Sequence, residues 1–256
     1  MFLWDQIAFG PVQSRRLGSS LGINVSPTTV KICSFDCIYC ECGWTFEKSI
    51  DPDLFFSVKE IMAAIEAKLL QCRDAGIQID SITFSGNGEP TLHPNFNQII
   101  DNLIVLRNKY FSKTSITCLS NATQLANKEV LKSLKKIENS VLKLDAVKEP
   151  LFQLINKPTI PVSVSDIITQ LQQLHGAFVL QTLFLKGEID GQRFNNAAEP
   201  HLALWLEVVQ QLHPKKVMLY SLDRSTPAQE LEKIPLEELD GIAQRVREMG
   251  VLAEAY

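Results

Sequence analysis

Short runs of apolar and β-branched residues alternate along the chain with longer stretches in which apolar residues recur every three or four positions. Six of the short runs predict β-strands, at 21–25, 81–84, 114–119, 140–144, 178–185 and 216–220. Their apolar character is nearly continuous, which is typical of strands that are covered on both faces, as in a parallel sheet.

The stretches with helical periodicity predict helices between and after these strands, at about 57–75, 95–110, 126–138, 164–175, 195–212 and 235–249. The first begins with Ser57-Val58-Lys59-Glu60, where a serine three residues ahead of a glutamate predicts a capping box. Ser165 and Gly176 are expected to bracket the fourth helix as its N-cap and C′ residues.

Six strand-then-helix units predict an α/β fold class, a partial (β/α)6 TIM-like barrel that stays open. No internal repeat, low-complexity segment or Pro/Gly/Ser-rich linker divides the chain. We therefore expect one domain over 1–256, with the C-terminal part, 195–256, completing the barrel. In barrels the chemistry lies at the C-terminal ends of the strands, so the loops that follow the strands should carry the functional residues.

Composition narrows the class of protein. With 45% hydrophobic and 21% charged residues the chain is globular, and its net charge of −4 gives no overall attraction to nucleic acid. The N-terminus does not have the pattern of a signal peptide, and no stretch is apolar for long enough to cross a bilayer. We expect a cytoplasmic protein whose cysteines stay reduced and act as metal ligands or packing residues.

Three cysteines follow the first predicted strand in the spacing C-x3-C-x2-C, at Cys33, Cys37 and Cys40, within a loop at 33–42. Thiolates are the usual protein ligands of iron–sulfur clusters, and three of them can hold three corners of a cubane while leaving one iron open to a substrate. The alternative is a zinc site completed by Cys42, although the chain has no second pair of closely spaced cysteines.

A glycine-rich turn, Gly86-Asn87-Gly88-Glu89-Pro90, follows the second predicted strand. Glycines let the backbone approach a ligand closely, and a glutamate there can accept hydrogen bonds from an ammonium group. An ordinary strand-to-helix turn is the alternative explanation.

Together, the cysteine spacing with Tyr39 before the last cysteine and the Gly-Asn-Gly-Glu-Pro turn resemble the radical S-adenosylmethionine (radical SAM) superfamily. Further stretches resemble the subgroup of radical enzymes that contains the wyosine-forming tRNA enzymes, at 9–18, 20–24, 143–146 and 219–227. The resemblance implies a [4Fe-4S] cluster and S-adenosylmethionine (SAM) as cofactors.

Carried onto this sequence, the resemblance implies that Cys33, Cys37 and Cys40 ligate the cluster and that Tyr39 lies beside the adenine. The methionine amino group would be held by the turn, and the rest of SAM by strand ends; these cofactor-binding candidates are Gly86, Asn87, Gly88, Glu89, Ser120, Asn121, Lys143, Asp145 and Gln181. Some have plainer alternatives: Lys143 and Asp145 as an internal ion pair, Asn121 as a turn cap, and Gln181 as a partner of backbone groups.

The implied activity is reductive cleavage of SAM to methionine and a 5′-deoxyadenosyl radical, which abstracts hydrogen from a substrate. It requires an external one-electron reductant such as a flavodoxin or ferredoxin, and we expect a monomer. The substrate is open among a tRNA base, a peptide and a small metabolite. For RNA, Arg15, Arg16 and Arg224 are candidate phosphate contacts, as are Lys132, Lys135 and Lys136, unless these lysines form a solvated helix face.

Two features set the chain apart from the RNA and peptide enzymes. No cysteine precedes Cys33, where the archaeal wyosine enzymes carry additional cysteines, and there is no C-terminal cysteine cluster of the kind found in many peptide-modifying members. Cys72 and Cys118 are expected to be packing residues, and no role is predicted for Cys42. The alternative class is a non-enzymatic iron–sulfur or zinc-binding module, which has no need of a methionine-binding turn.

Overall fold

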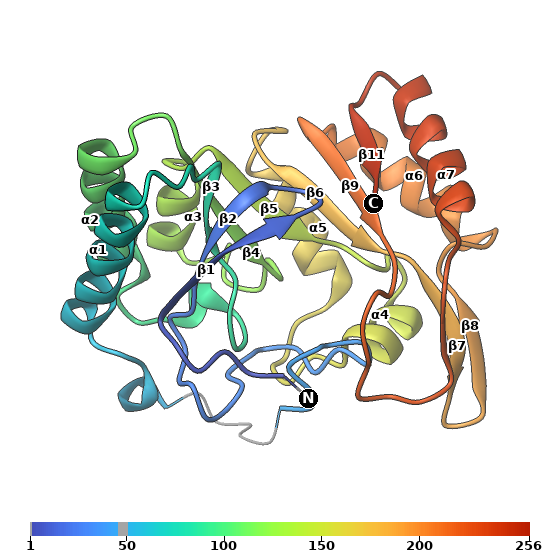
Figure 1. Ribbon diagram of the computed structural model, residues 1–256. Helices are drawn as coiled ribbons and strands as arrows, with labels where there is room; N and C mark the ends of the chain where they lie inside the picture. The colour runs from blue at the N-terminus through green and yellow to red at the C-terminus, as the bar shows by residue number, and fades with distance from the viewer. Residues whose placement is uncertain (1, 46–50) are drawn as a thin grey trace.

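The computed structural model describes residues 2–45 and 51–256, and its centre is one curled, eight-stranded sheet (Figure 1). Its strands, in spatial order, are β1 (Ala8–Ser14), β2 (Gly18–Ile23), β3 (Ser81–Phe84), β4 (Ser115–Ser120), β5 (Asn139–Lys143), β6 (Val179–Leu183), β9 (Lys216–Tyr220) and β11 (Ala253–Ala255). Strand β1 pairs antiparallel with β2, and all other neighbours are parallel. The sheet does not close on itself, so the predicted open, partial barrel is confirmed.

Helices cover the outer, convex side of this sheet (Figure 1). They are α1 (Val58–Asp74), α2 (Phe96–Tyr110), α3 (Lys128–Leu134), α4 (Glu149–Asn156), α5 (Val164–Gln172), α6 (His201–Leu212) and α7 (Leu236–Glu248), with two 3-10 turns, η1 (Pro52–Leu54) and η2 (Pro90–Leu92). Among the described residues no helix has the length and apolarity that a membrane span requires.

The six predicted strands are all present, but the sheet is larger than six strands because β1 and β11 extend its two edges. The run at 178–185 divides between β6 and a second, three-stranded antiparallel sheet in the order β10 (Leu231–Lys233), β7 (Leu185–Ile189) and β8 (Gln192–Asn195). The predicted helix at 195–212 therefore begins only at His201. Asp190 and Gly191 both have positive φ and turn the chain into the β7–β8 hairpin, as Asp-Gly pairs commonly do.

Of the predicted helix caps, one is confirmed and two are wrong. The Ser57 side chain accepts from the Glu60 amide and the Glu60 carboxylate accepts from the Ser57 amide, which confirms the capping box. The N-cap of α5 is Ser163, paired in the same way with Asp166, so the prediction of Ser165 is wrong. Helix α5 ends at Gln172, and Gly176 is therefore not its C′ residue.

The concave side of the barrel is apolar at its base and polar towards the C-terminal ends of the strands. Val141, Val179 and Met218 form a small buried cluster against partly buried Leu17, Leu119 and Tyr256. Because strand side chains alternate, Lys143, Gln181 and Tyr220 project from the same face two residues further along. The fold thus closes the lower end with packed apolar side chains and leaves polar groups at the edge where the loops begin.

His201 makes the free energy of unfolding depend on pH. Its side chain is buried at the start of α6, neither ring nitrogen has a partner among the described residues, and burial lowers its pKa to about 4. Since the unfolded chain takes up this proton near pH ~6.5, stability falls as the pH drops from about 6.5 towards 4, by on the order of 2 kcal/mol.

Urea unfolding at pH 7 and pH 4.5 checks this prediction. We expect the loss of stability between the two pH values to be smaller in His201→Leu than in wild type, and unchanged in His175→Gln, which alters an exposed histidine. An equal loss in wild type and His201→Leu would show that His201 does not control this dependence.

Candidate functional site

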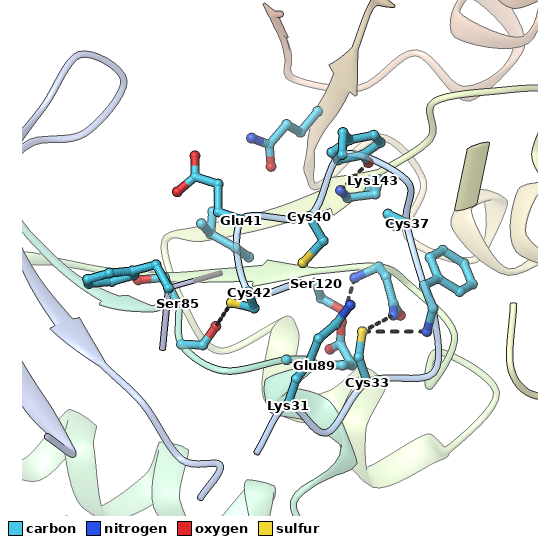
Figure 2. A pocket seen from close by; sticks show the side chains of 18 of the residues that line it. Lys31, Cys33, Cys37, Cys40, Glu41, Cys42, Ser85, Glu89, Ser120 and Lys143 are labelled. Atoms are coloured by element: carbon cyan, nitrogen blue, oxygen red, sulfur yellow. Dashed lines mark hydrogen bonds between the residues drawn. The ribbon is translucent and has the colours of Figure 1, made fainter. Parts of the chain in front are cut away.

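Three of the cysteines lie on one loop over the C-terminal edge of the sheet, after β2. Cys33, Cys37 and Cys40 line one cavity of about 280 Å³, called here the first cavity. Tight turns shape the loop, with Cys40 N donating to Cys37 O at 3.1 Å and Gly43 N to Cys40 O at 2.8 Å. Figure 2 shows the side chains of Cys33 and Cys40 turned towards a common space, with Lys31 and Glu89 beside them, while a dashed line joins the Cys42 sulfur to a backbone carbonyl on its other side.

One backbone amide of the loop and two side-chain amides from distant segments contact two of these sulfurs. Cys33 Sγ accepts from Phe35 N at 3.5 Å and from Asn121 Nδ2 at 3.6 Å, and Cys37 Sγ accepts from Asn156 Nδ2 at 3.6 Å. Such donors favour thiolates and orient metal ligands. The Cys42 thiol instead donates to the Gly86 carbonyl at 3.6 Å.

Lys31 places a buried positive charge among the cysteines. It is 4% exposed, and its Nζ donates to Gly43 O at 2.9 Å and lies 3.6 Å from Asp36 Oδ1. Burial alone lowers its pKa, but attraction to Cys40, Cys33 and Cys37 outweighs burial and raises it. Burial raises the pKa of Cys33 to about 12, and Lys31 opposes that rise.

These residues fit an iron–sulfur cluster. The donor set is three thiols from one loop, with amide donors and an ammonium group close by to balance the negative charge that thiolates carry. Among residues 2–45 and 51–256, no three His, Cys, Asp or Glu side chains lie close enough together to hold a single metal ion.

The glycine-rich turn after β3 packs directly against the chain that leads into Cys33. Ile32 N donates to Asn87 O at 3.0 Å, and Glu89 N donates to Ile32 O at 2.9 Å. Gly88 has a φ of +133°, and a Cβ there would lie 1.7 Å from Ile32 O. The turn therefore requires glycine because another backbone occupies the space of a side chain.

The two polar residues of this turn are largely engaged within the protein. Asn87 is fully buried, and its amide binds the backbone of Trp4 and the Pro27 carbonyl. The Glu89 carboxylate accepts from Asn121 N at 2.7 Å and from Thr91 Oγ1 at 2.5 Å, while burial raises its pKa. Glu89 still lines the first cavity, whereas Asn87 does not.

Tyr39 joins the cysteine loop to the end of β5. Its hydroxyl donates to Asp145 and accepts from Lys143 Nζ at 2.6 Å. Lys143 Nζ lies 3.9 Å from Asp145 Oδ2, and that carboxylate also accepts from Asn156 Nδ2 and Leu183 N, at 2.8 and 2.9 Å. Lys143 and Asp145 thus form the internal ion pair that was the plainer alternative for them, with Tyr39 between them.

Most of the predicted site residues come together around the first cavity. Lining it are Cys33, Cys37, Cys40, Tyr39, Gly86, Gly88, Glu89, Ser120, Asn121, Lys143 and Gln181. Lys143 and Gln181 are neighbours in register on β5 and β6. Asn87 and Asp145 are not among the lining residues; both are buried beneath it.

Sequence reasoning did not single out four residues of this region: Trp4, Lys31, Asn156 and Tyr220. Three of them line the first cavity, and Asn156 contacts Cys37 and Asp145 from the end of α4. Lys31, a lysine two residues before a cysteine triplet, was the one visible signal. Trp4 and Asn156 come from distant parts of the chain, and no local pattern marks them; Tyr220 lies in the 219–227 stretch that carries the resemblance, but no role was predicted for it.

The candidate phosphate contacts divide into two groups, because Arg15, Arg16 and Arg224 line a neighbouring cavity and the three lysines do not. Lys135 caps the end of α3 and donates to the Gln173 carbonyl. Lys136 follows it and pairs with Asp101, and neither lysine lines the first cavity. Lys132 lies within α3. Arg15 pairs with Asp223 at 2.8 Å and Arg224 with Glu41 at 2.7 Å.

Replacing Asp145 by asparagine is expected to lower the free energy of unfolding by roughly 2 kcal/mol. The buried carboxylate accepts three hydrogen bonds, and an amide would set a donor against the Tyr39 hydroxyl and the Asn156 amide. In the control Asp223→Asn an exposed ion pair is lost, at a cost below about 1 kcal/mol. Urea unfolding measures the loss of stability in both variants. Equal losses would mean that the buried network around Asp145 stabilises the fold no more than an exposed ion pair does.

Comparison with known proteins places the chain in a protein family. The family model of the Radical SAM superfamily matches residues 28–193. A UPF0026 protein of Synechocystis sp., slr1464, is 31% identical over 229 residues, which cover 88% of this chain and 78% of the relative. The UPF0026 protein MJ1312 of Methanocaldococcus jannaschii is 30% identical over 217 residues, and the match covers 83% of this chain but only 62% of that relative's length.

Solved structures share the fold at low sequence identity. A radical SAM methyltransferase from Sphaerobacter thermophilus superposes with a TM-score of 0.65 at 15% identity, covering 93% of this chain and 66% of that one. SuiB of Streptococcus suis, bound to S-adenosylmethionine, gives a TM-score of 0.63 at 15% identity, covering 92% of this chain and 50% of that one. The family match includes the cysteine loop and the glycine-rich turn, and from it we conclude that this chain belongs to the radical SAM superfamily.

Proposed function

We propose that the protein is a radical SAM enzyme that holds a [4Fe-4S] cluster through Cys33, Cys37 and Cys40. The observation that carries the proposal is that three thiols of one loop line the same cavity as the glycine-rich turn, although the two segments lie far apart in the sequence. When bound and reduced, the cluster supplies the electron that splits SAM into methionine and a 5′-deoxyadenosyl radical, which takes hydrogen from the substrate.

The chain's own residues are proposed to bind and orient the cluster and SAM. Lys31 offsets the negative charge of the thiolates, and the amides of Asn121 and Asn156 fix two of the sulfurs. Backbone groups of Gly86 and Gly88 and the Glu89 carboxylate, all at the cavity wall, are proposed to receive the methionine part of SAM. Glu89 then exchanges or shares hydrogen bonds that it now makes to Thr91 and Asn121.

The other end of SAM is proposed to lie along the ends of β4, β5 and β6. Ser120, Lys143 and Gln181 line the first cavity there, next to Tyr39. The Tyr39 hydroxyl is already held by Lys143 and Asp145, so its ring is fixed before any ligand arrives. Asp145 acts through Tyr39 and Lys143, since it does not line the cavity.

We further propose that residues 1–256 form one domain in which 195–256 complete the barrel. Strands β9 and β11 belong to the same sheet as β2 to β6, which supports this arrangement. The reaction needs an external one-electron donor, such as a flavodoxin or ferredoxin. Relationship to the wyosine-type enzymes stays a prediction, and the acceptor of the radical remains among a tRNA base, a peptide and a metabolite.

The test is to purify the protein without oxygen, reconstitute it with iron and sulfide, reduce it, and measure 5′-deoxyadenosine by chromatography. We expect about four irons per chain and formation of 5′-deoxyadenosine from SAM. A protein that takes up zinc and leaves SAM intact would overturn the proposal in favour of a non-enzymatic metal-binding module.

A further inference from the structure

A second cavity, of about 480 Å³, adjoins the first. It is bounded by the β1–β2 hairpin, the cysteine loop and the segment after β9. Of the residues predicted for the cluster and SAM, only Tyr39 and Cys40 line it. The predicted contacts to the methionine part of SAM, Gly86, Gly88 and Glu89, belong to the first cavity alone. The second cavity therefore offers space beside the cysteine loop that these SAM contacts leave open.

Arg16 lies where the two cavities meet and lines both. The β1–β2 hairpin extends across the sheet towards β9 (Figure 1). Arg16 lies in its tight turn, and the Arg16 guanidinium carbon lies 4.5 Å from the centre of the Tyr220 ring. Its Nη1 is buried and has no hydrogen-bond partner in the part of the chain that the structure describes.

The acidic side chains around Arg16 are engaged elsewhere. Glu41 and Asp223 line the second cavity and pair with Arg224 and Arg15, respectively. Glu89, in the first cavity, is held by Thr91 and Asn121. Within the described residues Arg16 forms no ion pair. Arg16 is half-buried and always charged, and its buried Nη1 lacks a hydrogen-bond acceptor among those residues, which is unfavourable unless a ligand supplies one.

We propose that the second cavity is the substrate site and that Arg16 binds a negatively charged oxygen group of the substrate, a phosphate or a carboxylate. The Tyr220 ring holds one face of the guanidinium, and the planar N–H edge is then free to bind two oxygens of one anion. The inference rests on the proposed function, because it takes SAM to occupy the first cavity.

The test uses reconstituted, oxidised protein, freed of unbound iron, and inorganic phosphate and acetate as separate probes, with and without saturating SAM. Phosphate binding is followed by broadening of its ³¹P resonance and acetate binding by calorimetry. We expect saturable binding of at least one anion that persists with SAM present and weakens roughly 10- to 100-fold in Arg16→Gln. Arg16→Lys, which keeps the charge without the planar fork, should fall between the two.

Arg193→Gln is the matched control, because it removes the same charge at a residue that lines neither cavity and whose exposed guanidinium is already paired with Glu188. We expect it to weaken anion binding by less than about threefold. The stronger of the two probes identifies the anionic group as phosphate or carboxylate.

Two results would overturn the inference. One is anion binding that is absent, or that is equal in wild type and Arg16→Gln. The other is displacement of the anion by SAM together with an equal loss of SAM affinity in Arg16→Gln, which would assign Arg16 to the carboxylate of SAM. No reductant is used, so these results are independent of whether SAM is cleaved, and failure of the proposed function is read separately.

Discussion

Replacing Cys37 by alanine is expected to remove the iron–sulfur cluster and to lower SAM cleavage roughly a thousandfold or more. Cys37 is buried, its sulfur contacts the Asn156 amide, and it lines the first cavity together with Cys33 and Cys40. A cubane held by three thiolates cannot lose one without losing an iron corner. Iron and sulfide analysis and the chromatographic assay for 5′-deoxyadenosine measure the two effects.

Two further cysteine variants make this result specific. Cys72→Ala deletes a buried thiol on α1, away from the site, and should keep the full iron content. Cys42→Ala decides between three thiolate ligands and the four of the zinc alternative, because Cys42 also lines the first cavity. Loss of metal in Cys42→Ala equal to that in Cys37→Ala would contradict ligation by three cysteines.

Gly88→Ala is expected to reduce the free energy of unfolding by about 4 kcal/mol or more, or to prevent folding altogether. A methyl group there would overlap the Ile32 carbonyl, at 1.7 Å from its oxygen and 2.5 Å from its carbon, and the φ of +133° is unfavourable for any L side chain. The obstacle is backbone, which is itself fixed by hydrogen bonds from Glu89 N and to Asn87 O, so it cannot move aside cheaply.

Gly250→Ala separates the steric effect from backbone strain. Gly250 also has a positive φ, of +82°, but nothing lies within 4 Å of a Cβ placed on it, so only a cost of roughly 1–2 kcal/mol is expected. Urea unfolding curves of the two variants give the comparison. If both variants lose the same free energy of unfolding, the close approach of Ile32 to Gly88 does not contribute to the cost of the substitution.

The parts of the fold that follow from local pattern were predictable from the sequence. Runs such as Ser81–Phe84 and Lys216–Tyr220 are rich in apolar and β-branched residues because helices cover one face and the barrel interior the other, and both runs form strands. Strand β11, by contrast, is three residues long and pairs with β9, from which α7 separates it in the sequence. It is too short for a hydrophobic periodicity to predict it. The hairpin over 185–195 had a visible signal in Asp190-Gly191, but the helical period at 195–212 was extended across its end.

In the candidate site, too, local sequence patterns predict some features and not others. The cysteine spacing and the glycine-rich turn are recognisable from the sequence alone, and most of the predicted residues line one cavity. Side-chain direction was not predictable. Asn87 turns away to bind Trp4 and Pro27, and Asp145 lies beneath the cavity, in contact with Asn156. Those partners are remote in sequence, so only the assembled fold determines which oxygen or nitrogen faces the cavity.

The most direct test of the central claim is the electron paramagnetic resonance spectrum of the reconstituted, reduced protein before and after addition of SAM. We expect a signal of a reduced [4Fe-4S] cluster whose line shape changes when SAM is added, because SAM is proposed to bind next to the three cysteines. We also expect that Cys37→Ala gives no such signal. A reduced cluster whose spectrum is indifferent to SAM, or a protein that holds no iron, would contradict the claim that this cavity brings SAM and an iron–sulfur cluster together.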